Sequence, residues 1–261
     1  MCKYTGCWRP HLIVLSSAFD VFVGAGLRLH DSPNHHMRIE NCTVVRVDHL
    51  IVDSPLLSPN TDGVNFYGGK DQSFTNSVVT NGDDCVSCRG GSLVVQNITC
   101  RGGHGISIGG VRHGTVSNVT FRNITATGGV GNTQGKYSTG GARLKSYPNS
   151  TGSVYDIIFE DIVFDGVYTP LQLLGHYCPW PCNTPDGNNP GTLFHDITFR
   201  NIRGGGRRQL QGQFTCSPKA TCVNITVENV NLFQGGDPKK GGSFECEHAV
   251  LNVRNSTPEA C

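Results

Sequence analysis

The chain has 261 residues, enough for one sizeable domain but too few for two comfortable ones. Thirty-four residues are glycines, and Asn, Thr, Val and Ile are prominent, so the composition favours strands and turns over helices. The formal net charge of +1 excludes a general attraction to nucleic acids or membranes, and any affinity for a polyanion has to be local.

The first twenty residues lack the features of an export signal, because the apolar stretch His11–Leu15 is short and no clean small-residue cleavage site follows it. The chain also has no apolar run long enough to cross a membrane. Twelve cysteines and seven N-x-S/T sequons are nevertheless typical of a secreted, disulfide-bonded glycoprotein. The sequons begin at Asn41, Asn97, Asn118, Asn123, Asn149, Asn224 and Asn255. We therefore expect an extracellular protein whose natural N-terminus is missing.

A phrase of alternating apolar and polar residues around an Asn or Asp recurs along the chain, which indicates short strands. It occupies residues 37–45, 93–100, 119–127, 157–165, 197–204 and 225–233. Its anchor residue falls at Asn41, Asn97, Asn123, Asp161, Asn201 and Asn229. Intervals of 26, 28, 38 and 40 residues between anchors fit coils of about two dozen residues with loops of varying length.

This repeat predicts an all-β solenoid, a parallel β-helix. A β-sandwich is the serious alternative, but its strands do not repeat one phrase, and the leucine framework or amphipathic helices of other repeat proteins are absent. We expect a single domain over 1–261, with recognisable coils from about residue 37. Adjacent coils should lie about 4.8 Å apart, with stacked Asn and apolar side chains filling the interior.

Polar motifs follow one another at regular spacing: N-T-D-G at 60–63, G-D-D-C at 82–85 and G-H-G at 103–105. Asp62, Asp83 and His104 are each 21 residues apart, so we expect them to stack on one face of the coils, about 5 Å from one another. R-L-K at 143–145 lies 39 residues beyond His104, one coil plus an inserted Gly- and Thr-rich loop at 129–141. Arg143 and Lys145 are two apart, so their side chains leave a strand on the same side.

This set of groups suits hydrolysis of a glycosidic bond. Neighbouring carboxylates raise one another's pKa, so one can stay protonated as a general acid while the others remain charged and activate water. An inverting glycosidase needs this division, with water held between acid and base. The two cations suit the carboxylate of a uronic acid.

In this order, the motifs N-T-D, D-D, G-H-G and R-x-K resemble the four signature motifs of the polygalacturonases of glycoside hydrolase family 28. The resemblance runs from about residue 37 to the C-terminus. It implies a right-handed parallel β-helix that hydrolyses α-1,4-linked galacturonan with inversion, as a monomer in the cell wall, with no metal or organic cofactor. The implied roles are a general acid at Asp83, water activation by Asp62 and Asp84, orientation of the acid by His104, and substrate binding by Asn60, Arg143, Lys145 and Tyr177.

The resemblance also implies a bridge between Cys85 and Cys100, which would brace the surface that carries Asp83 and His104. Cys216 with Cys222 and Cys246 with Cys261 look like C-terminal loop bridges, and Cys178 with Cys182 is a further candidate pair. Cys2, Cys7, Cys42 and Cys88 stay unassigned. Cys85 and Cys88 are spaced C-x-x-C, but no second pair accompanies them to make a zinc site.

Each motif also has a plainer interpretation: a turn at 81–84, a loop histidine at 104, a solvated strand face at 143–145 and a packing tyrosine at 177. A catalytically inactive carbohydrate-binding β-helix and a calcium-dependent pectate lyase therefore remain alternatives to a polygalacturonase. The phrase N-G-D-D-C-V-S and the cysteine-bearing loop 175–190 resemble exo-acting members more than endo-acting ones. Homogalacturonan and xylogalacturonan stay open as substrates.

Overall fold

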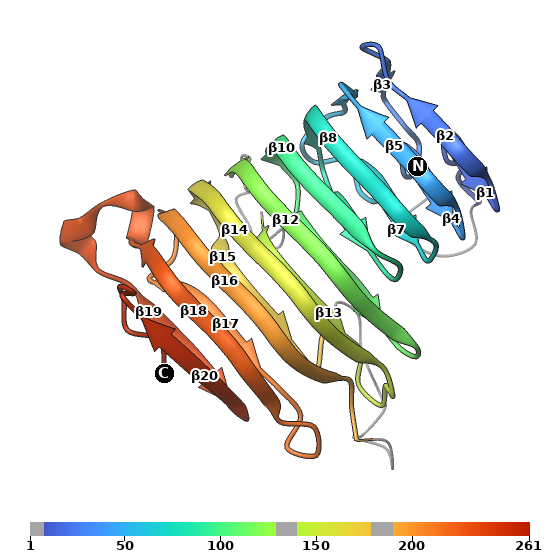
Figure 1. Cartoon of the computed structure of the whole chain (residues 1–261). Coiled ribbons are helices and arrows are strands. Elements are labelled where there is room, and N and C mark those ends of the chain that lie inside the picture. The colour runs from blue at the N-terminus through green and yellow to red at the C-terminus, as the bar shows by residue number, and fades with distance from the viewer. Residues whose placement is uncertain (1–7, 129–139, 179–189) are drawn as a thin grey trace.

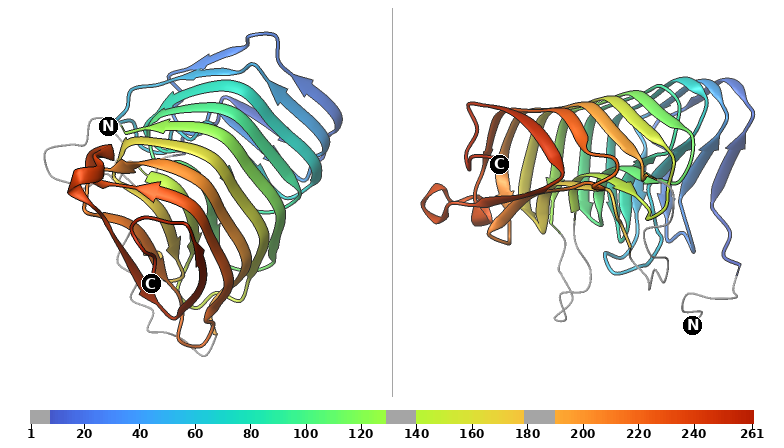
Figure 2. Two further views of the ribbon diagram at one scale, coloured as in Figure 1. Left: turned by 60° about the vertical axis from the view of Figure 1, so that its left-hand side comes forward. Right: turned by 90° about the horizontal axis from the view of Figure 1, so that it is seen from below.

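The chain winds into successive coils, each of which adds a strand to two parallel sheets (Figure 1). The computed structural model describes residues 8–128, 140–178 and 190–261. All strand pairings between neighbouring coils are parallel, and the protein is a right-handed parallel β-helix, as the sequence repeat predicts. Figure 2 shows the coils in profile, stacked along one axis with β1 and β2 at one end and β19 and β20 at the other.

One sheet has nine strands within the described residues. In spatial order they are β1 (Ile13–Ser16), β4 (Met37–Glu40), β7 (Val64–Tyr67), β9 (Asp84–Cys88), β11 (Gly105–Val111), β13 (Gly140–Ser146), β15 (Thr169–Leu174), β17 (Leu210–Thr215) and β19 (Ser243–Glu247). We call it the nine-stranded sheet. Of the loop expected at 129–141, Gly140 and Gly141 are described, and they begin β13.

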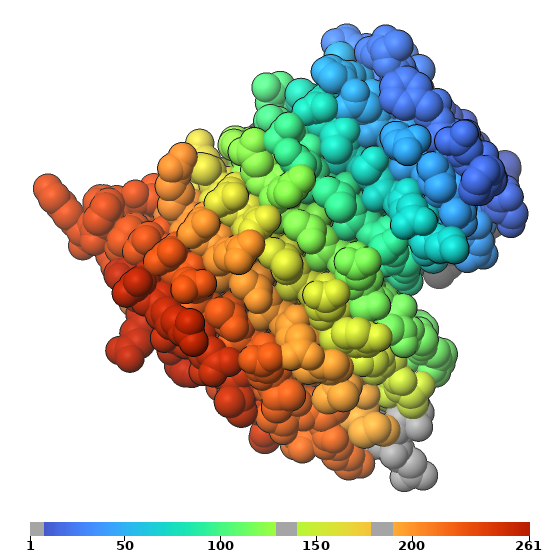
Figure 3. Space-filling model, viewed as in Figure 1, coloured from blue at the N-terminus to red at the C-terminus, as the bar shows by residue number. Residues whose placement is uncertain are grey.

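The other sheet has eleven strands in the described part of the chain, and its outer face shows the coils as successive colour bands (Figure 3). Its main path is β2 (Phe19–Val23), β5 (Thr43–Asp48), β8 (Lys70–Asn81), β10 (Leu93–Gly102), β12 (Thr115–Thr127), β14 (Ser153–Val167), β16 (Leu193–Gly206), β18 (Cys222–Leu232) and β20 (Ala249–Arg254). The short strands β3 (Arg28–His30) and β6 (Ile51–Asp53) join it at the side.

Coils begin before residue 37, because β1, β2 and β3 pair with β4, β5 and β6. The only helical segments in the described residues are the 3-10 turns η1 (Gln234–Gly236) and η2 (Pro238–Lys240). No helix found there is long and apolar enough to span a membrane.

Apolar side chains at equivalent positions of successive coils fill the interior. Phe121 stacks on Phe159 with ring centroids 4.8 Å apart, and Phe159 stacks on Phe199 at 5.1 Å. These separations match the distance between paired strands, so each ring lies directly above its counterpart. All three are fully buried, which confirms the predicted apolar ladders.

The expectation that the Asn anchors also fill the interior was wrong. Asn97 and Asn123 are exposed and form an external ladder, in which Asn123 Nδ2 donates to Asn97 Oδ1 at 2.7 Å and Asn97 Nδ2 donates to Asn76 Oδ1 at 2.8 Å. Their φ angles are +57° and +49° for Asn97 and Asn123, a left-handed conformation that short polar side chains tolerate best. The anchor therefore marks a bend of the strand, at which its amide faces solvent.

Three disulfides within the described residues have the pairing expected from the sequence: Cys85–Cys100, Cys216–Cys222 and Cys246–Cys261. Cys85 lies on β9 and Cys100 lies on β10, so their bridge ties the two sheets together beside the acidic motifs. Cys42 and Cys88 are buried free thiols. Cys2, Cys7 and Cys182 lie outside the described residues.

Candidate active site

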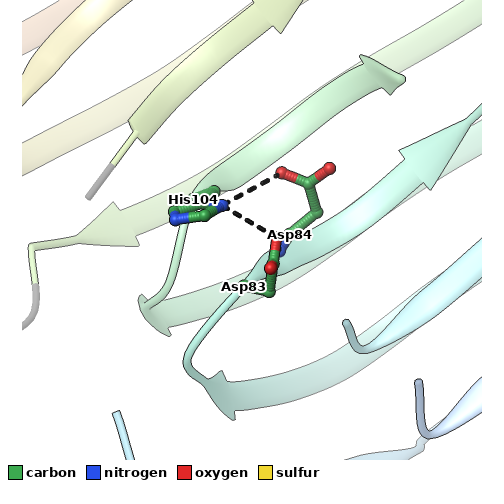
Figure 4. Close-up of side chains that lie close together, drawn as sticks. All are labelled: Asp83, Asp84 and His104. Atoms are coloured by element: carbon green, nitrogen blue, oxygen red, sulfur yellow. Dashed lines mark hydrogen bonds and ion pairs between the residues drawn. The ribbon is translucent and has the colours of Figure 1, made fainter. Parts of the chain in front are cut away.

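Asp83, Asp84 and His104 meet at the edge where strands of the nine-stranded sheet begin (Figure 4). Asp83 is in the turn between β8 and β9, Asp84 is the first residue of β9, and His104 directly precedes β11. The His104 amide donates to the Asp83 carbonyl at 2.8 Å, which sets the two residues one coil apart at the same level. Nδ1 of His104 lies 2.8 Å from Oδ1 of Asp83 and 4.0 Å from Oδ1 of Asp84.

Asp62 approaches this group from the preceding coil, but not in a straight column. Val64 pairs with Val86, an offset of 22 residues, which places Asp62 level with Asp84. Gly105 pairs with Asp84, an offset of 21, and the register shifts directly after it. The 21-residue spacing thus matches the alignment of Asp83 with His104. Asp62 is aligned with Asp84, one residue away from Asp83. Asn65 Nδ2 donates to Asp62 Oδ2 at 3.0 Å.

Asp84 is held from the far side of the site. Lys145 Nζ donates to Asp84 Oδ2 at 2.8 Å, and Ser107 Oγ donates to the same oxygen at 2.7 Å. Both carboxylate and ammonium are buried, with side-chain exposures of 4% and 7%. This contact links β9 to β13 across β11, so the R-x-K motif belongs to the acidic cluster.

Arg143 lies on β13 two residues before Lys145, on the same side of the strand, and is 3% exposed. Among the described residues, its Nε and Nη1 atoms have no hydrogen-bond partner. The Tyr177 ring lies 5.5 Å from Arg143 Cζ and 5.5 Å from Lys145 Nζ. A buried guanidinium with unused N–H groups is costly unless an acceptor arrives, so the geometry of Arg143 fits an anionic ligand.

Asn60 lies beside the site in a different way from that expected. Its backbone N–H donates to Asp83 Oδ2 at 3.2 Å, while its side-chain oxygen accepts from Arg9. The left-handed conformation of Asn60, with φ of +58°, turns its amide towards the carboxylate. Its contact with Asp83 is therefore made through the backbone, whereas the sequence pointed to the side chain.

The surroundings shift the pKa values of the three carboxyl groups in different directions. Burial, together with the charges of Asp83 and Asp84, raises the pKa of Asp62 well above its usual value. Burial is the largest influence on the pKa of Asp84 and raises it, but the charges of Lys145, His104 and Arg143 together outweigh it and the net shift is downward. For Asp83, burial is opposed by a charged His104, by the hydrogen bond to it and by Lys145, and the net pKa is lowered. Asp62 is therefore the carboxyl that keeps its proton most readily.

Sequence reasoning missed Asn65 and Ser107, which hold Asp62 and Asp84. A signal for both exists, because each lies three residues after a motif residue, a position that Ser87 repeats after Asp84. Ser87 occupies the equivalent outward position of β9, paired with Asn65 and Ser107. Small polar residues thus occupy one row across β7, β9 and β11, next to the acids.

Among the described residues, the group that could hold a metal ion is Asp83, Asp84 and His104, whose ligand atoms lie within 4.8 Å of one another. The set fits a calcium ion poorly, since calcium takes six to eight oxygen ligands and this cluster offers two carboxylates. One oxygen of Asp84 is, in addition, already bound by Lys145. The carboxylates and cations of this site therefore suit direct interaction with a substrate better than binding of calcium.

The family model described as glycosyl hydrolases family 28 matches residues 2–257. The chain belongs to this family. It is 32% identical to a polygalacturonase of Brassica napus over 241 residues, which is 88% of this chain and 58% of that protein. It is 31% identical to an exopolygalacturonase of Arabidopsis thaliana, over 87% of this chain and 50% of that protein. The chain thus spans about half to three fifths of these two relatives' length.

Solved structures share the fold of this family 28 chain. An endo-xylogalacturonan hydrolase from Aspergillus tubingensis superposes with a TM-score of 0.76 at 23% identity, over 95% of this chain and 69% of that one. A polygalacturonase from Erwinia carotovora superposes with a TM-score of 0.67 at 18% identity, over 93% and 60%. At these identities the likeness concerns the β-helix.

Proposed function

We propose that this family 28 chain is a polygalacturonase, which hydrolyses the α-1,4 bonds of galacturonan with inversion and acts from chain ends. The observation that carries the proposal is the buried Arg143, whose unpartnered N–H groups lie beside Lys145, next to three carboxylates. Hydrolysis of a glycosidic bond needs paired carboxylic groups, and a uronate needs a cation for its carboxylate. The site offers both within one surface.

Asp83 is our first assignment for the proton donor, with His104 as the residue that orients it. Their 2.8 Å contact lets the imidazole hold the Asp83 carboxyl in place beside the leaving oxygen. The lowered pKa of Asp83 depends on a positive His104 and counts against a carboxylic acid that holds a proton alone. Asp62, whose pKa is raised, is the competing candidate for the acid.

In the first assignment, Asp62 and Asp84 activate the attacking water. Lys145 and Ser107 keep Asp84 charged, which suits a base that accepts the proton of water. Asp84 Oδ1 is buried and has no hydrogen-bond partner in the described residues, so it is the free acceptor for that water. Asp62 Oδ2 is already engaged by Asn65.

Action from chain ends is supported by the 31% identity to an exopolygalacturonase and by the phrase N-G-D-D-C-V-S. The loop 175–190 gave the same indication, but its residues 179–189 are outside the described part of the chain. Three disulfides support a protein made in an oxidising compartment, and we propose secretion to the cell wall. Of the two pectic polymers we choose homogalacturonan, because the cations Arg143 and Lys145 match the carboxylate of a galacturonate unit.

The test is hydrolysis of polygalacturonate, followed by reducing ends, product size and ultraviolet absorbance, with and without a chelator. We expect monomer release without an unsaturated product and without chelator sensitivity. An unsaturated product indicates a lyase, and binding without turnover indicates an inactive carbohydrate-binding protein. NMR should show the new reducing ends first as the β anomer, and an α anomer at the start overturns inversion.

The acid is identified with an aryl galacturonide whose leaving group departs with little protonic help. Asp83→Asn should lose several orders of magnitude of turnover on the polymer and recover much of it on this substrate. Asp62→Asn and Asp84→Asn should recover little. Recovery by Asp62→Asn in place of Asp83→Asn moves the acid to Asp62, and equal deficits in all three remove the assignment of Asp83.

A further inference from the structure

A second cluster of cations lies on the nine-stranded sheet, apart from Arg143 and Lys145. The ring of Tyr67, the last residue of β7, is flanked by two guanidinium groups. Arg38 Cζ from β4 lies 4.3 Å from the ring centroid, and Arg89 Cζ, directly after β9, lies 5.2 Å from it. Three successive coils thus contribute one residue each to an Arg–Tyr–Arg sandwich.

The sandwich shares a surface with the acids. Arg38 pairs with Asn65, the residue that donates to Asp62, and Tyr67 is two residues further along the same strand and faces the same side. Burial raises the pKa of Tyr67, the charges of Arg89 and Arg38 lower it, and those of Asp62 and Asp84 raise it. The charges of both guanidinium groups and of two of the acids therefore act on this ring.

Arg89 is available to a ligand. It is exposed, and within the described ranges no ion pair or hydrogen bond of its side chain occurs besides its contact with the Tyr67 ring. Its side chain passes over Gly109 of the next coil, where a Cβ atom would lie 2.7 Å from Arg89 Nε. The absence of a side chain at Gly109 therefore leaves room for the side chain of Arg89.

Arg38 is less free than Arg89, since it forms an ion pair with Glu40 and its Nη1 lies 3.4 Å from His11 Nε2. Stacking on Tyr67 occupies the flat faces of both guanidinium groups. Stacking leaves the N–H edge of a guanidinium uncovered, and this edge is the part of arginine that binds a carboxylate in a bidentate manner.

Charge is distributed unequally along this surface. The outward position of Arg38 on β4 corresponds to Arg143 on β13, and then to Gln172, Gln213 and Glu245 on the following strands. Gln213 Nε2 donates to Glu245 Oε2 at 3.3 Å. The positive charge of this row thus lies at Arg38 and Arg143, on the side from β4 to β13, and the row turns neutral and then acidic towards its C-terminal end. A polyanion that crosses the site is attracted to that side.

We propose that Arg38, Tyr67 and Arg89 form a second carboxylate-binding subsite, which holds a uronate unit of the polymer at the carboxyl ends of β7 and β9, the opposite ends of these strands from Asp62 and Asp83. The identity of the polymer rests on the proposed function. The subsite is separate from Arg143 and Lys145 and takes a sugar unit away from the bond that is cleaved. Its effect is to make longer substrates bind more tightly than short ones.

The test uses Arg89→Gln with galacturonate oligomers of two to six units. Affinity is measured by calorimetry in the Asp83→Asn background, so that binding is observed without turnover. We expect Arg89→Gln to weaken the longest oligomer about tenfold, the effect of one exposed charge-assisted contact, and to leave the dimer nearly unchanged. Arg38→Gln should act in the same direction. Arg122→Gln, an exposed arginine on β12 of the other sheet, is the matched control.

An equal loss for every length, or no loss for the longest oligomer, overturns the subsite. The outcome is distinguishable from failure of the proposed function. If the wild type hydrolyses polygalacturonate but Arg89→Gln keeps its length dependence, the subsite is wrong and the activity stands. If the wild type binds oligomers without cleaving them and Arg89→Gln loses the length dependence, the subsite stands and the activity falls. No binding by the wild type removes both.

Discussion

Lys145 Nζ lies 2.8 Å from Asp84 Oδ2, although the two residues are 61 positions apart and separated by β11. The contact is buried, and it joins the R-x-K motif to the second aspartate of the D-D motif. It keeps Asp84 charged in a place where burial favours the neutral form. The stability of the fold and the charge of the site are therefore linked at this pair.

Replacing Lys145 with Met should lower the free energy of unfolding by about 3 kcal/mol at pH 7, because a buried carboxylate loses its partner. The folded pKa of Asp84 lies below its unfolded value, so this stabilisation is present above about pH 4 and lost as the pH falls through the folded pKa. Chemical denaturation at pH 7 and pH 3 checks this. The exposed Lys70→Met is the control, and a deficit that is as large at pH 3 contradicts the prediction.

Asp62→Asn should make the protein more stable at neutral pH while it loses activity. The pKa of Asp62 is raised by burial and by two neighbouring charges, so the ionised form costs folding free energy at pH values above its folded pKa. Asparagine has nearly the same shape and carries no charge. Below about pH 4 the carboxyl is protonated in both states, and the difference should shrink. Thermal melts over pH 3–8 test this, and a destabilised variant at pH 7 argues against it.

Arg143→Ala should weaken binding of galacturonate oligomers by roughly 1.5–3 kcal/mol, the range of a charge-assisted hydrogen bond. Its buried Nε and Nη1 atoms are the donors that a uronate carboxylate would fill. Fully methyl-esterified pectin should be a poor substrate of the wild type for the same reason. Calorimetry with oligomers and rates on the two polymers provide the measurements. Equal rates on esterified and de-esterified polymer refute the role of Arg143.

Replacing both Cys85 and Cys100 with Ala should lower the free energy of unfolding by about 3 kcal/mol, because their bridge closes a loop with a sequence separation of 15 residues. The Cys216–Cys222 bridge closes 6 residues, and its removal should cost less, about 2 kcal/mol in the same entropic account. Denaturant unfolding of the two double variants gives the comparison. Peptide mapping without reduction should recover Cys85 linked to Cys100, and a link of Cys85 to Cys88 contradicts the structure.

Local sequence was sufficient for the strands and for the contact between Asp83 and His104. Alternation of β-branched and polar residues at 157–165 predicts the strand that β14 contains, because side chains of a strand point to opposite faces. The one-coil spacing of Asp83 and His104 predicts their contact, because parallel coils repeat the same position. The pairing of Cys85 with Cys100 followed from the resemblance to known polygalacturonases and is present.

Contacts between coils were decided by the tertiary structure. The register between β7 and β9 differs by one residue from that at the start of β11, and so Asp62 lies beside Asp84. Since a single-residue shift changes which side chains meet, spacing alone could not assign the proton to Asp62 or to Asp83. The same holds for Asn97, whose outward direction depends on its left-handed backbone. The Tyr67 sandwich likewise brings together residues 38, 67 and 89, which no sequence motif connects. Sequence determined which groups this protein has, and the register of its coils determined which of them touch.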